Sequence, residues 1–372
     1  MQQRRTIPFF NYPALFAAQE PELMAVLRDV CGRGAYILQR DCREFEENVA
    51  KFTGAKHVLG VANGTDAIWL GLRAVGIGPG DEVIVPSHTY IASVASIHFV
   101  GATPVLADCG PDHMLDPQSV HKLVTKRTRA IMPVQLNGRT CDMDALQAIA
   151  DEHDLMIVED AAQGLGSKFK GRMAGTFGKF GTISLYPAKL LGCFGDGGLV
   201  MTNDDEVARR VGLLRDHGRN EEGKVVAWGF NSRLDNLQAA ILNFKMKSFP
   251  QALERRRAIA ARYQARLGSL AEMTLPPAPD ADPRHYDVYQ NYEVEADRRD
   301  ELRAYLEEQG VRTIIQWGGT PVHQFAELGF KDVNLPATDR LFKRCFLLPM
   351  HTALSDEDVD YICDAIRAFY GK

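Results

Sequence analysis

The sequence contains no apolar run of about 18 or more residues, the length that a membrane-spanning helix needs. Met1–Thr6 is polar and basic, and no apolar stretch of the kind found in a signal peptide follows it. The 43 basic and 48 acidic residues are spread through the chain without a block of basic residues. We therefore expect a protein that neither enters a membrane nor binds nucleic acid.

Cysteine is also scarce. The seven cysteines are an odd number, irregularly spaced, and none form a Cys-x-x-Cys pair. This pattern argues against both a disulfide framework and a zinc site, so we expect no bound metal. A reducing cytoplasm is the compartment that suits such a chain best.

The chain is longer, at 372 residues, than one hydrophobic core usually serves, because cores stop growing near about 250–300 residues. Up to about residue 245, short apolar runs alternate with amphipathic stretches. The runs are HVLGVA (57–62), EVIVP (82–86), PVLAD (104–108), RAIMPV (129–134) and LMIVED (155–160). This alternation predicts an α/β domain over residues 1–245, with helices on both faces of a mostly parallel sheet. Ligands of such sheets bind at the carboxyl ends of the strands.

A different pattern follows residue 245 and predicts a smaller α+β domain over residues 246–372. A helical stretch from Leu234 to Leu270 is interrupted at Pro250 and leads to a proline-rich linker. The elements expected next are a strand in YDVYQNYEVEA (286–296), a helix ending at Gly310, a strand in VRTIIQW (311–317) and a closing helix that begins with a capping box of Ser355 and Asp358.

Two acidic residues end the expected strand in LMIVEDAAQ, and Gln163 follows three residues after Asp160. A carboxylate fixed at the end of a strand can pair with a cationic ring nitrogen and keep it protonated. Asp160 is the candidate for such a pair. The alternative is that Asp160 caps the next helix, which is the more common role of an acidic residue at this position.

A lysine follows a second apolar strand, expected at residues 182–186, and precedes a glycine-rich turn. Desolvation of Lys189 would favour its neutral amine, which can condense with an aldehyde, and the glycines would let a flat ring approach. The spacing between Asp160 and Lys189 leaves room for one strand-turn-strand excursion, which brings both residues to one edge of the sheet. Taken alone, the segment also fits a surface lysine beside a turn.

A third strand-helix junction contains Asn63, Gly64 and Thr65. Free backbone N–H groups at the start of a helix bind anions, and Gly64 would allow a phosphate to approach closely. Asn-Gly is also a common turn sequence, so this junction is ambiguous when taken alone.

Together these motifs resemble the DegT/DnrJ/EryC1/StrS family of nucleotide-sugar aminotransferases, which use pyridoxal 5'-phosphate (PLP). The similarity runs through nearly the whole chain and keeps the motifs in order. They are NGTDA (63–67), PSHTYIAS (86–93), GATPVLAD (101–108), EDAAQ (159–163), SLYPAK (184–189), GDGGLVMTND (195–204), LRDHGRN (214–220), FNSRLDNLQAAIL (230–242) and LPMHTALSDEDVDYI (348–362).

The resemblance implies a fold type I PLP-transferase, with a seven-stranded, mostly parallel sheet in the large domain. It implies that Lys189 forms a Schiff base with PLP and moves the proton during the reaction, and that Asp160 pairs with the pyridinium nitrogen. The other implied cofactor contacts are Gln163 beside the ring, Tyr90 stacked on the ring, Gly64, Thr65 and Ser184 at the phosphate, and Asn231 reaching the phosphate from the neighbouring subunit of a homodimer. The implied substrate contacts are His217, Arg233 and His323.

Outside that resemblance, Tyr90 could be a core aromatic residue, and lone histidines are more often structural than functional. The chain also departs from the family in two places. Trp317-Gly318-Gly319 replaces a proline-aromatic segment, and Gln135 and Asn137 stand where histidine and tyrosine are frequent. We expect both departures to lie at the substrate, where they affect the identity of the sugar and not the chemistry.

The expected reaction is a transamination in two halves, in which an amino acid, L-glutamate in our expectation, loads the cofactor and a nucleotide-linked keto-sugar takes the amine. The product would be an amino sugar for a polysaccharide or glycoconjugate. Three alternatives remain. A sugar dehydratase of this family carries histidine in place of Lys189, a non-catalytic PLP-binding regulator needs an effector or DNA-binding domain, and an NAD-dependent oxidoreductase needs a G-x-G-x-x-G turn, which does not follow the first expected strand.

Overall fold

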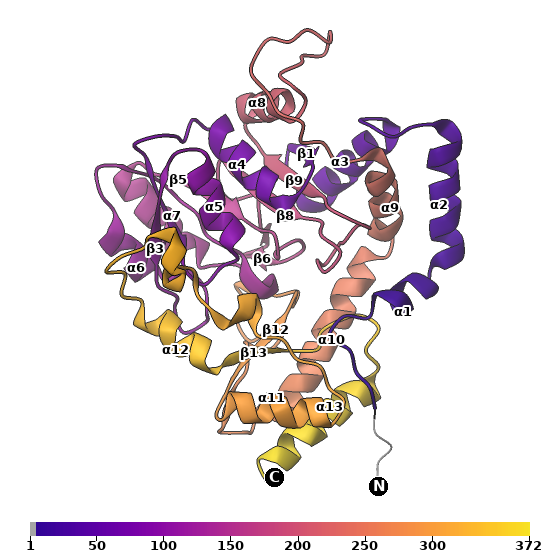
Figure 1. Ribbon diagram of the computed structural model, residues 1–372, viewed down its shortest axis with the longest axis vertical. Coiled ribbons are helices and arrows are strands. Elements are labelled where there is room, and N and C mark those ends of the chain that lie inside the picture. The colour runs from indigo at the N-terminus through magenta and orange to yellow at the C-terminus, as the bar shows by residue number, and fades with distance from the viewer. Residues whose placement is uncertain (1–4) are drawn as a thin grey trace.

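The computed structural model describes residues 5–372 (Figure 1), so most of the basic stretch Met1–Thr6 lies outside the described residues. Its centre is a seven-stranded sheet with the strand order β1-β9-β8-β5-β4-β2-β3. The strands are β1 (His57–Val61), β2 (Glu82–Pro86), β3 (Thr103–Ala107), β4 (Thr128–Ile131), β5 (Met156–Asp160), β8 (Phe180–Ser184) and β9 (Gly198–Thr202). All neighbouring pairs are parallel except the two that involve β9. The prediction of a mostly parallel α/β sheet is confirmed.

Helices cover this sheet and create two hydrophobic cores. They are α1 (Tyr12–Ala17), α2 (Glu20–Arg33), α3 (Arg40–Thr53), α4 (Gly64–Ala74), α5 (Ile91–Phe99), α6 (Pro117–Leu123), α7 (Met143–His153), α8 (Asp205–Arg215) and α9 (Asn236–Met246). One core lies under α4, α5, α7 and α8, and the other lies under α3 and α9. Strands buried from both sides explain why the sequence shows continuous apolar runs here.

A smaller antiparallel sheet of order β10-β12-β13 lies below the large sheet in Figure 1. Its strands and helices are β10 (Met273–Thr274), β12 (Tyr292–Ala296), β13 (Cys345–Leu348), α10 (Phe249–Leu267), α11 (Arg299–Glu308), α12 (Pro336–Arg344) and α13 (Asp356–Phe369). A third hydrophobic core fills this part and also contains Ile7, which pairs with Val311. The division of the chain at residue 245 stays a prediction.

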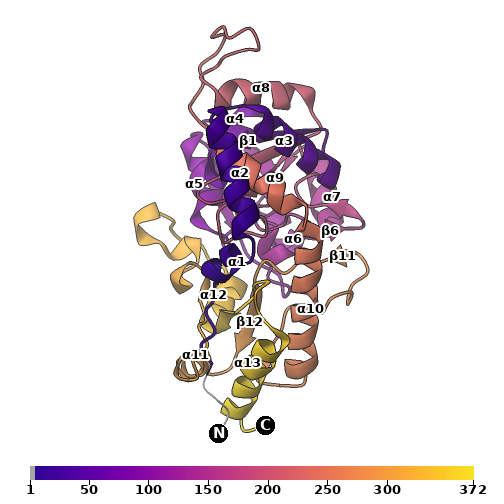
Figure 2. The same cartoon turned by 90° about the vertical axis from the view of Figure 1, so that its right-hand side faces the viewer.

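The long helix α10 joins the two parts, as Figure 2 shows. Its first residues pack in the core under α3 and α9, and its later residues pack in the core of the smaller sheet. The expected interruption at Pro250 occurs just before it, at residues 247–248, and Pro250 occupies the first turn of α10. Proline is tolerated there because the N–H that it lacks would have no partner in the helix.

Two expected helix ends in the smaller part are confirmed. Ser355 Oγ accepts a hydrogen bond from Asp358 N (3.1 Å), and Asp358 Oδ2 accepts one from Ser355 N (3.2 Å), so the capping box forms at α13. Gly310 follows the end of α11 with a φ of 80°, a left-handed conformation that glycine adopts without steric cost. Within residues 5–372, no helix combines the length and the apolar character that crossing a membrane would require.

Three predicted strands differ from the structure. The strand expected at 182–186 ends at Ser184, because β8 stops pairing with β9 where the glycine-rich turn begins. The stretch VRTIIQW makes only isolated bridges and then enters the short 3-10 helix η2 (Gln316–Gly319), in which Trp317 and Gly318 have positive φ. In YDVYQNYEVEA only Tyr292–Ala296 is in the small sheet, since Tyr286 pairs with Lys168 in a separate three-stranded sheet and Tyr289 has a positive φ.

A short hairpin separates β5 from β8, as the spacing between Asp160 and Lys189 predicts. It consists of β6 (Lys168–Phe169) and β7 (Arg172–Met173), and β6 also pairs with β11 (His285–Tyr286). The chain then returns to the sheet as β8, directly beside β5. The carboxyl ends of β5 and β8 are therefore neighbours at one edge of the sheet.

Candidate active site

A cavity of about 750 Å³ lies at the carboxyl ends of the parallel strands. It is lined by residues of both sheets and by the first turn of α4. The predicted site residues that line it are Gly64, Thr65, Tyr90, Asp160, Gln163, Ser184 and Lys189. Residues at or just after the carboxyl ends of four strands, β1, β2, β5 and β8, therefore meet in one cavity, and β5 and β8 lead into further strands and not into helices.

Asp160 ends β5 and is held by both its backbone and its side chain. Its backbone N–H donates to Pro133 O (3.0 Å), and its side-chain oxygens accept from Ser93 Oγ (2.6 Å) and from Ala162 N (3.0 Å). Burial raises the pKa of the Asp160 carboxyl, while these two hydrogen bonds and the charge of Lys189 oppose the rise. A cationic group in the cavity would therefore stabilise the ionised form of the buried Asp160 carboxyl.

Lys189 lies in the segment that leaves β8 at the carboxyl edge. Burial lowers the pKa of its ammonium group, and the charge of Asp160 opposes that change. The neutral amine, the form that attacks a carbonyl, is thereby favoured. The chain turns back directly afterwards at Gly192, where a Cβ would lie 2.5 Å from Pro187 O, so this turn requires glycine.

The effect of the Asp160 charge on the pKa of Lys189 leads to a prediction about pH dependence. The Asp160 carboxylate raises the pKa of Lys189, so Asp160→Asn should lower that pKa further and make the neutral amine available at lower pH. We expect the rate at which the cofactor-free variant condenses with added PLP, followed by near-visible absorbance, to reach half its maximum at a lower pH than in the wild type. Asp196→Asn, which changes another carboxylate of the same cavity, should leave the midpoint in place. A midpoint that moved to higher pH in Asp160→Asn would contradict this coupling.

The part of the cavity beside the first turn of α4 is suited to a phosphate. Asn63 caps α4 by accepting a hydrogen bond from Asp66 N (2.8 Å), and the N–H groups of the first helical turn have no partner within the helix. A Cβ on Gly64 would lie 2.9 Å from Ser184 Cβ, so only glycine lets the backbone of Thr65 and the hydroxyl of Ser184 share this end. The cavity thus combines an anion site, a reactive lysine and a buried carboxylate, and these groups fit PLP.

Tyr90 caps the start of α5 and is 56% exposed at the cavity. This exposure excludes the alternative that Tyr90 is a core aromatic residue. Its stacking on a cofactor ring stays a prediction.

Four other predicted residues do not line the cavity at the strand ends of their own chain. Asn231, His217 and Arg233 lie on the connection between α8 and α9, where Arg233 Nη1 pairs with Asp216 Oδ1 at 2.7 Å. His323 is bound at its two ring nitrogens by Ser87 Oγ (2.8 Å) and Asp339 Oδ1 (3.0 Å). Their roles as cofactor or substrate contacts stay predictions.

The two family departures have different positions in the structure. Gln135 is fully buried and bridges Glu159 Oε2 (2.6 Å) and Cys141 N (2.8 Å), so the expectation that it contacts a substrate is not met. Asn137 lies directly behind the cavity, where its side-chain oxygen accepts from Gln316 Nε2 (2.5 Å). Trp317 lines the cavity as expected.

The sequence analysis missed several polar residues of the site. Gln290, Asn291 and Gln316 line the cavity from the smaller part, and Gln290 Nε2 donates to Ala188 O (2.7 Å), next to Lys189. Ser93, which holds Asp160, lies within a motif of the family resemblance but was not singled out. The only signal for Gln290 and Asn291 was a polar pair that interrupts an otherwise strand-like stretch.

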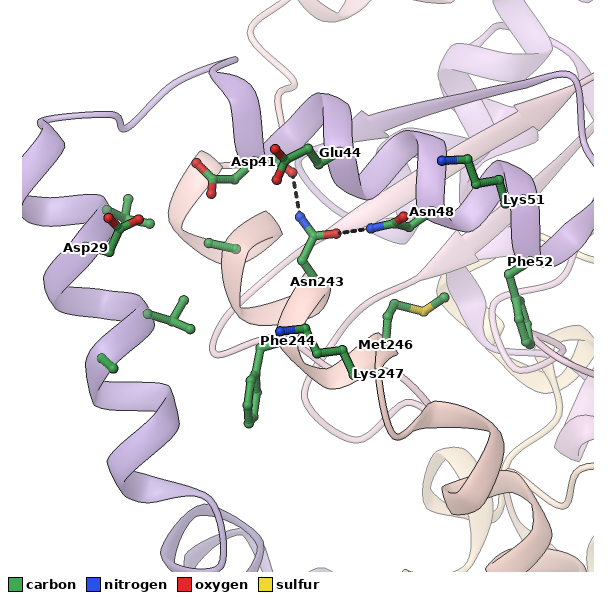
Figure 3. A pocket seen from close by; sticks show the side chains of 14 residues that line it. Asp29, Asp41, Glu44, Asn48, Lys51, Phe52, Asn243, Phe244, Met246 and Lys247 are labelled. Carbon is green, nitrogen blue, oxygen red and sulfur yellow. Dashed lines mark hydrogen bonds between the residues drawn. The ribbon is translucent and has the colours of Figure 1, made fainter.

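A separate cavity of about 810 Å³ opens between α2, α3 and α9 (Figure 3). Asn243 of α9 accepts from Asn48 Nδ2 (2.9 Å) and donates to Asp41 O (2.9 Å), which ties α9 to α3 along this cavity. None of the predicted site residues lines it. The residues predicted to hold the cofactor, Asn231 excepted, line the cavity at the strand ends instead.

A sequence model described as the DegT/DnrJ/EryC1/StrS aminotransferase family matches residues 18–367. The chain belongs to this family. Among curated relatives of the DegT/DnrJ/EryC1/StrS aminotransferases, one named dTDP-3-amino-3,4,6-trideoxy-alpha-D-glucose transaminase, from Streptomyces venezuelae, is 41% identical over 97% of this chain and 95% of its own length. Another, named pleiotropic regulatory protein, from Geobacillus stearothermophilus, is 39% identical over 98% of each chain.

Solved structures of the DegT/DnrJ/EryC1/StrS aminotransferases have the same fold. The crystal structure of S. venezuelae DesV in complex with a ketimine intermediate superposes with a TM-score of 0.94, at 39% identity and with 99% of each chain covered. The predictions of a fold type I architecture and of an aminotransferase are thereby confirmed. Membership of this family also implies PLP as the cofactor.

Proposed function

We propose that this aminotransferase binds PLP through Lys189 and transfers an amino group from an amino acid, L-glutamate in our expectation, to a nucleotide-linked keto-sugar. The observation that carries the proposal is that Lys189, Asp160 and the first turn of α4 meet in one cavity. A lysine, a carboxylate and an anion site in one cavity match the aldehyde, the ring nitrogen and the phosphate of PLP.

Bound PLP would supply the electron sink for the reaction. Lys189 would hold the cofactor covalently and carry the proton between substrate and cofactor, since its lowered pKa favours the neutral amine. Asp160, fixed by Ser93, would keep the ring nitrogen protonated. Gly64, Thr65 and Ser184 would hold the phosphate. The bound phosphate would then position the ring between Tyr90 and the cavity wall.

A nucleotide-linked sugar is supported by the names of the relatives and by the space around Lys189. The S. venezuelae relative is named for a dTDP-linked amino sugar. In this chain Lys189 borders the cavity at the strand ends and also a second cavity of about 770 Å³, lined in part by α1 and α10. Two cavities that meet at one reactive amine leave room for a substrate much larger than an amino acid.

A homodimer with shared active sites is part of the same proposal. The connection between α8 and α9 projects from the body of the protein (Figure 1) and exposes Trp228 (95%), Val225 (68%) and Val226. Exposed apolar side chains grouped on a projecting segment are typical of a protein interface. Asn231 lies at the base of this segment, from which it would reach the phosphate in the partner's cavity.

We also place the protein in the cytoplasm. All seven cysteines are free thiols, and all except Cys31 are buried. Free buried thiols persist in a reducing compartment.

The substrate can be tested with a panel of nucleotide-linked 3-keto and 4-keto sugars, each supplied with L-glutamate. We expect at least one sugar to gain an amino group, detected by mass spectrometry, together with the release of 2-oxoglutarate. Lys189→Ala is the control and should give no product. If the protein carries the near-visible PLP band but aminates none of the sugars, the sugar assignment is wrong and the cofactor assignment stands.

The regulatory name of the Geobacillus relative favours one alternative, a PLP-binding regulator without catalysis. Such a protein would need a lysine to hold the cofactor but no group that moves a proton in turnover. Amination of any sugar in the panel would exclude it. The dehydratase alternative is disfavoured by Lys189 itself, because those enzymes carry histidine at this position.

A further inference from the structure

A chain of side-chain amides connects a buried carboxylate to the wall of the active-site cavity. Glu293 of β12 accepts a hydrogen bond from Asn137 Nδ2 (3.2 Å). Asn137 Oδ1 in turn accepts from Asn291 Nδ2 (2.9 Å) and from Gln316 Nε2 (2.5 Å). Each bond in this chain has a donor and an acceptor, so the orientation of one group determines the next.

Glu293 determines the direction of the first hydrogen bond in this series of amides, because its carboxylate is held in the ionised form. Its oxygens lie 2.9 Å from His113 Nδ1 and 3.4 Å from His88 Nε2. Burial alone would raise the pKa of Glu293, but the charge of His88 and the hydrogen bond from His113 lower it far below its usual range. Burial likewise lowers the pKa of His113, but hydrogen bonds to Glu293 and Glu295 outweigh that effect and raise it to about 9. An ionised carboxylate can only accept hydrogen bonds.

The orientation of Asn137 follows from this carboxylate. Its NH₂ group must face Glu293, so its carbonyl oxygen must face the cavity side. Asn291 and Gln316 must then turn their NH₂ groups towards that oxygen. As a result Gln316 directs its own carbonyl oxygen away from Asn137, and this buried oxygen has no hydrogen-bond partner among the described residues.

Gln163 is oriented by the same segment. Its Oε1 accepts from the backbone N–H of Asn137 (2.8 Å) and from Asn291 Nδ2 (3.4 Å). A backbone N–H can only donate, so the oxygen of Gln163 has to point towards Asn137 and its NH₂ group towards the cavity. Asn137 holds this position in a left-handed conformation with a φ of 55°, which asparagine tolerates better than most residues.

We propose that Glu293 is a positioning residue that fixes the direction of the side-chain amides of Asn137, Asn291 and Gln316, so that Gln316 offers an acceptor to a hydroxyl group of the sugar. Gln163 is held independently of Glu293, because a backbone N–H sets its direction. The inference rests on the proposed function for the identity of the sugar. Glu293 does not touch the sugar and acts through Asn137. A hydrogen-bond donor on the substrate satisfies the unpartnered oxygen of Gln316, which explains why a buried acceptor is left open at this position.

Glu293→Gln tests the proposal, because an amide at this position no longer dictates which way Asn137 faces. We expect KM of the PLP-loaded variant for the keto-sugar that the panel identifies to rise about 10-fold, the effect of losing one hydrogen bond. The maximum of the near-visible absorption band should stay in place, since Gln163 is held by the backbone of Asn137. We expect kcat to change less than KM.

Glu295→Gln is the matched control. Glu295 is buried in the same cluster and binds the other nitrogen of His113 (3.3 Å), but it does not contact Asn137. This variant removes the same charge and should lower the thermal stability without raising KM. If Glu293→Gln and Glu295→Gln gave the same KM, Glu293 would have only a structural role and the proposal would be wrong.

A single variant serves even if Glu293→Gln does not fold. Gln316→Met removes the acceptor and should raise KM without shifting the band. A Gln316→Met protein with the KM of the wild type would overturn the proposal.

A double variant tests the direction of the bonds. In Glu293→Gln combined with Asn137→Asp, the amide at 293 donates to the new carboxylate, and the carboxylate still accepts from Asn291 and Gln316. We expect this pair to return KM most of the way to its wild-type value. If the double variant were as impaired as Glu293→Gln alone, the proposed direction would be wrong. A wild-type protein without any PLP band would instead overturn the proposed function.

Discussion

Replacement of Lys189 by alanine should remove the near-visible absorption band of the PLP-loaded protein and lower kcat by at least about 10³-fold. The band depends on the covalent bond between the lysine amine and the cofactor aldehyde. The loss of turnover has two sources, because the variant lacks both this bond and the group that moves the proton, and general acid–base catalysis alone contributes about 10²–10⁴-fold. Absorbance spectra and initial rates with the sugar identified by the panel measure both effects.

Lys245→Ala is the matched control for this experiment. Lys245 is also a lysine whose pKa is lowered by burial, and it borders the second cavity that Lys189 borders. Its ammonium group donates to Gly192 O (2.5 Å) and does not line the cavity at the strand ends. We expect this variant to keep the band. A protein that kept the band without Lys189, or lost it without Lys245, would show that the cofactor is attached elsewhere.

The large sheet and the centre of the site could be predicted because their signals are local in the sequence. Each apolar run of the first 245 residues contains a strand of the large sheet, and the strands at the centre of that sheet are buried on both faces. Asp160 and the Asn63–Thr65 turn follow such strands directly, and Lys189 follows β8 at the same edge. The rule that ligands bind at the carboxyl ends of parallel strands then places these residues together without knowledge of distant contacts.

The wall contributed by the smaller part could not be predicted in this way. VRTIIQW has the composition of a strand, yet Trp317 adopts a positive φ and Gln316 bonds to Asn137, which belongs to the larger part. The same is true of Gln290 and Asn291, which leave the strand pattern because they bind groups of the large sheet. Contacts between residues more than 100 positions apart override local propensity here, and a single sequence carries no record of them.

Three of the residues whose roles stay predictions share a location. Asn231, His217 and Arg233 lie on the connection between α8 and α9, outside the cavity of their own chain. His217 has a φ of 56°, so the chain turns sharply where this connection leaves α8. If the connection enters the cavity of a second subunit, its exposed apolar side chains and these polar residues are explained by one contact. The question can be decided by asking in which chain Asn231 acts.

Subunit complementation should answer that question. Asn231→Asp places a negative charge against the phosphate, so the homodimer of this variant should be impaired. The homodimer of Lys189→Ala should be inactive. In a heterodimer of the two variants, a site that takes Asn231 from the partner would have one intact copy, formed by Lys189 of one chain and Asn231 of the other. We therefore expect the purified heterodimer to recover about half of the wild-type activity, since one of two symmetric sites is whole.

The control is a heterodimer of Lys189→Ala and Asp160→Ala. Both residues line the cavity of the same chain, so neither site of this heterodimer is intact and no activity should return. If the Asn231→Asp heterodimer were equally inactive, Asn231 would act within its own chain and the shared site would be excluded. Recovery in the first heterodimer and not in the second would assign Asn231 to the partner's site, because only a site divided between two chains is repaired by exchanging them.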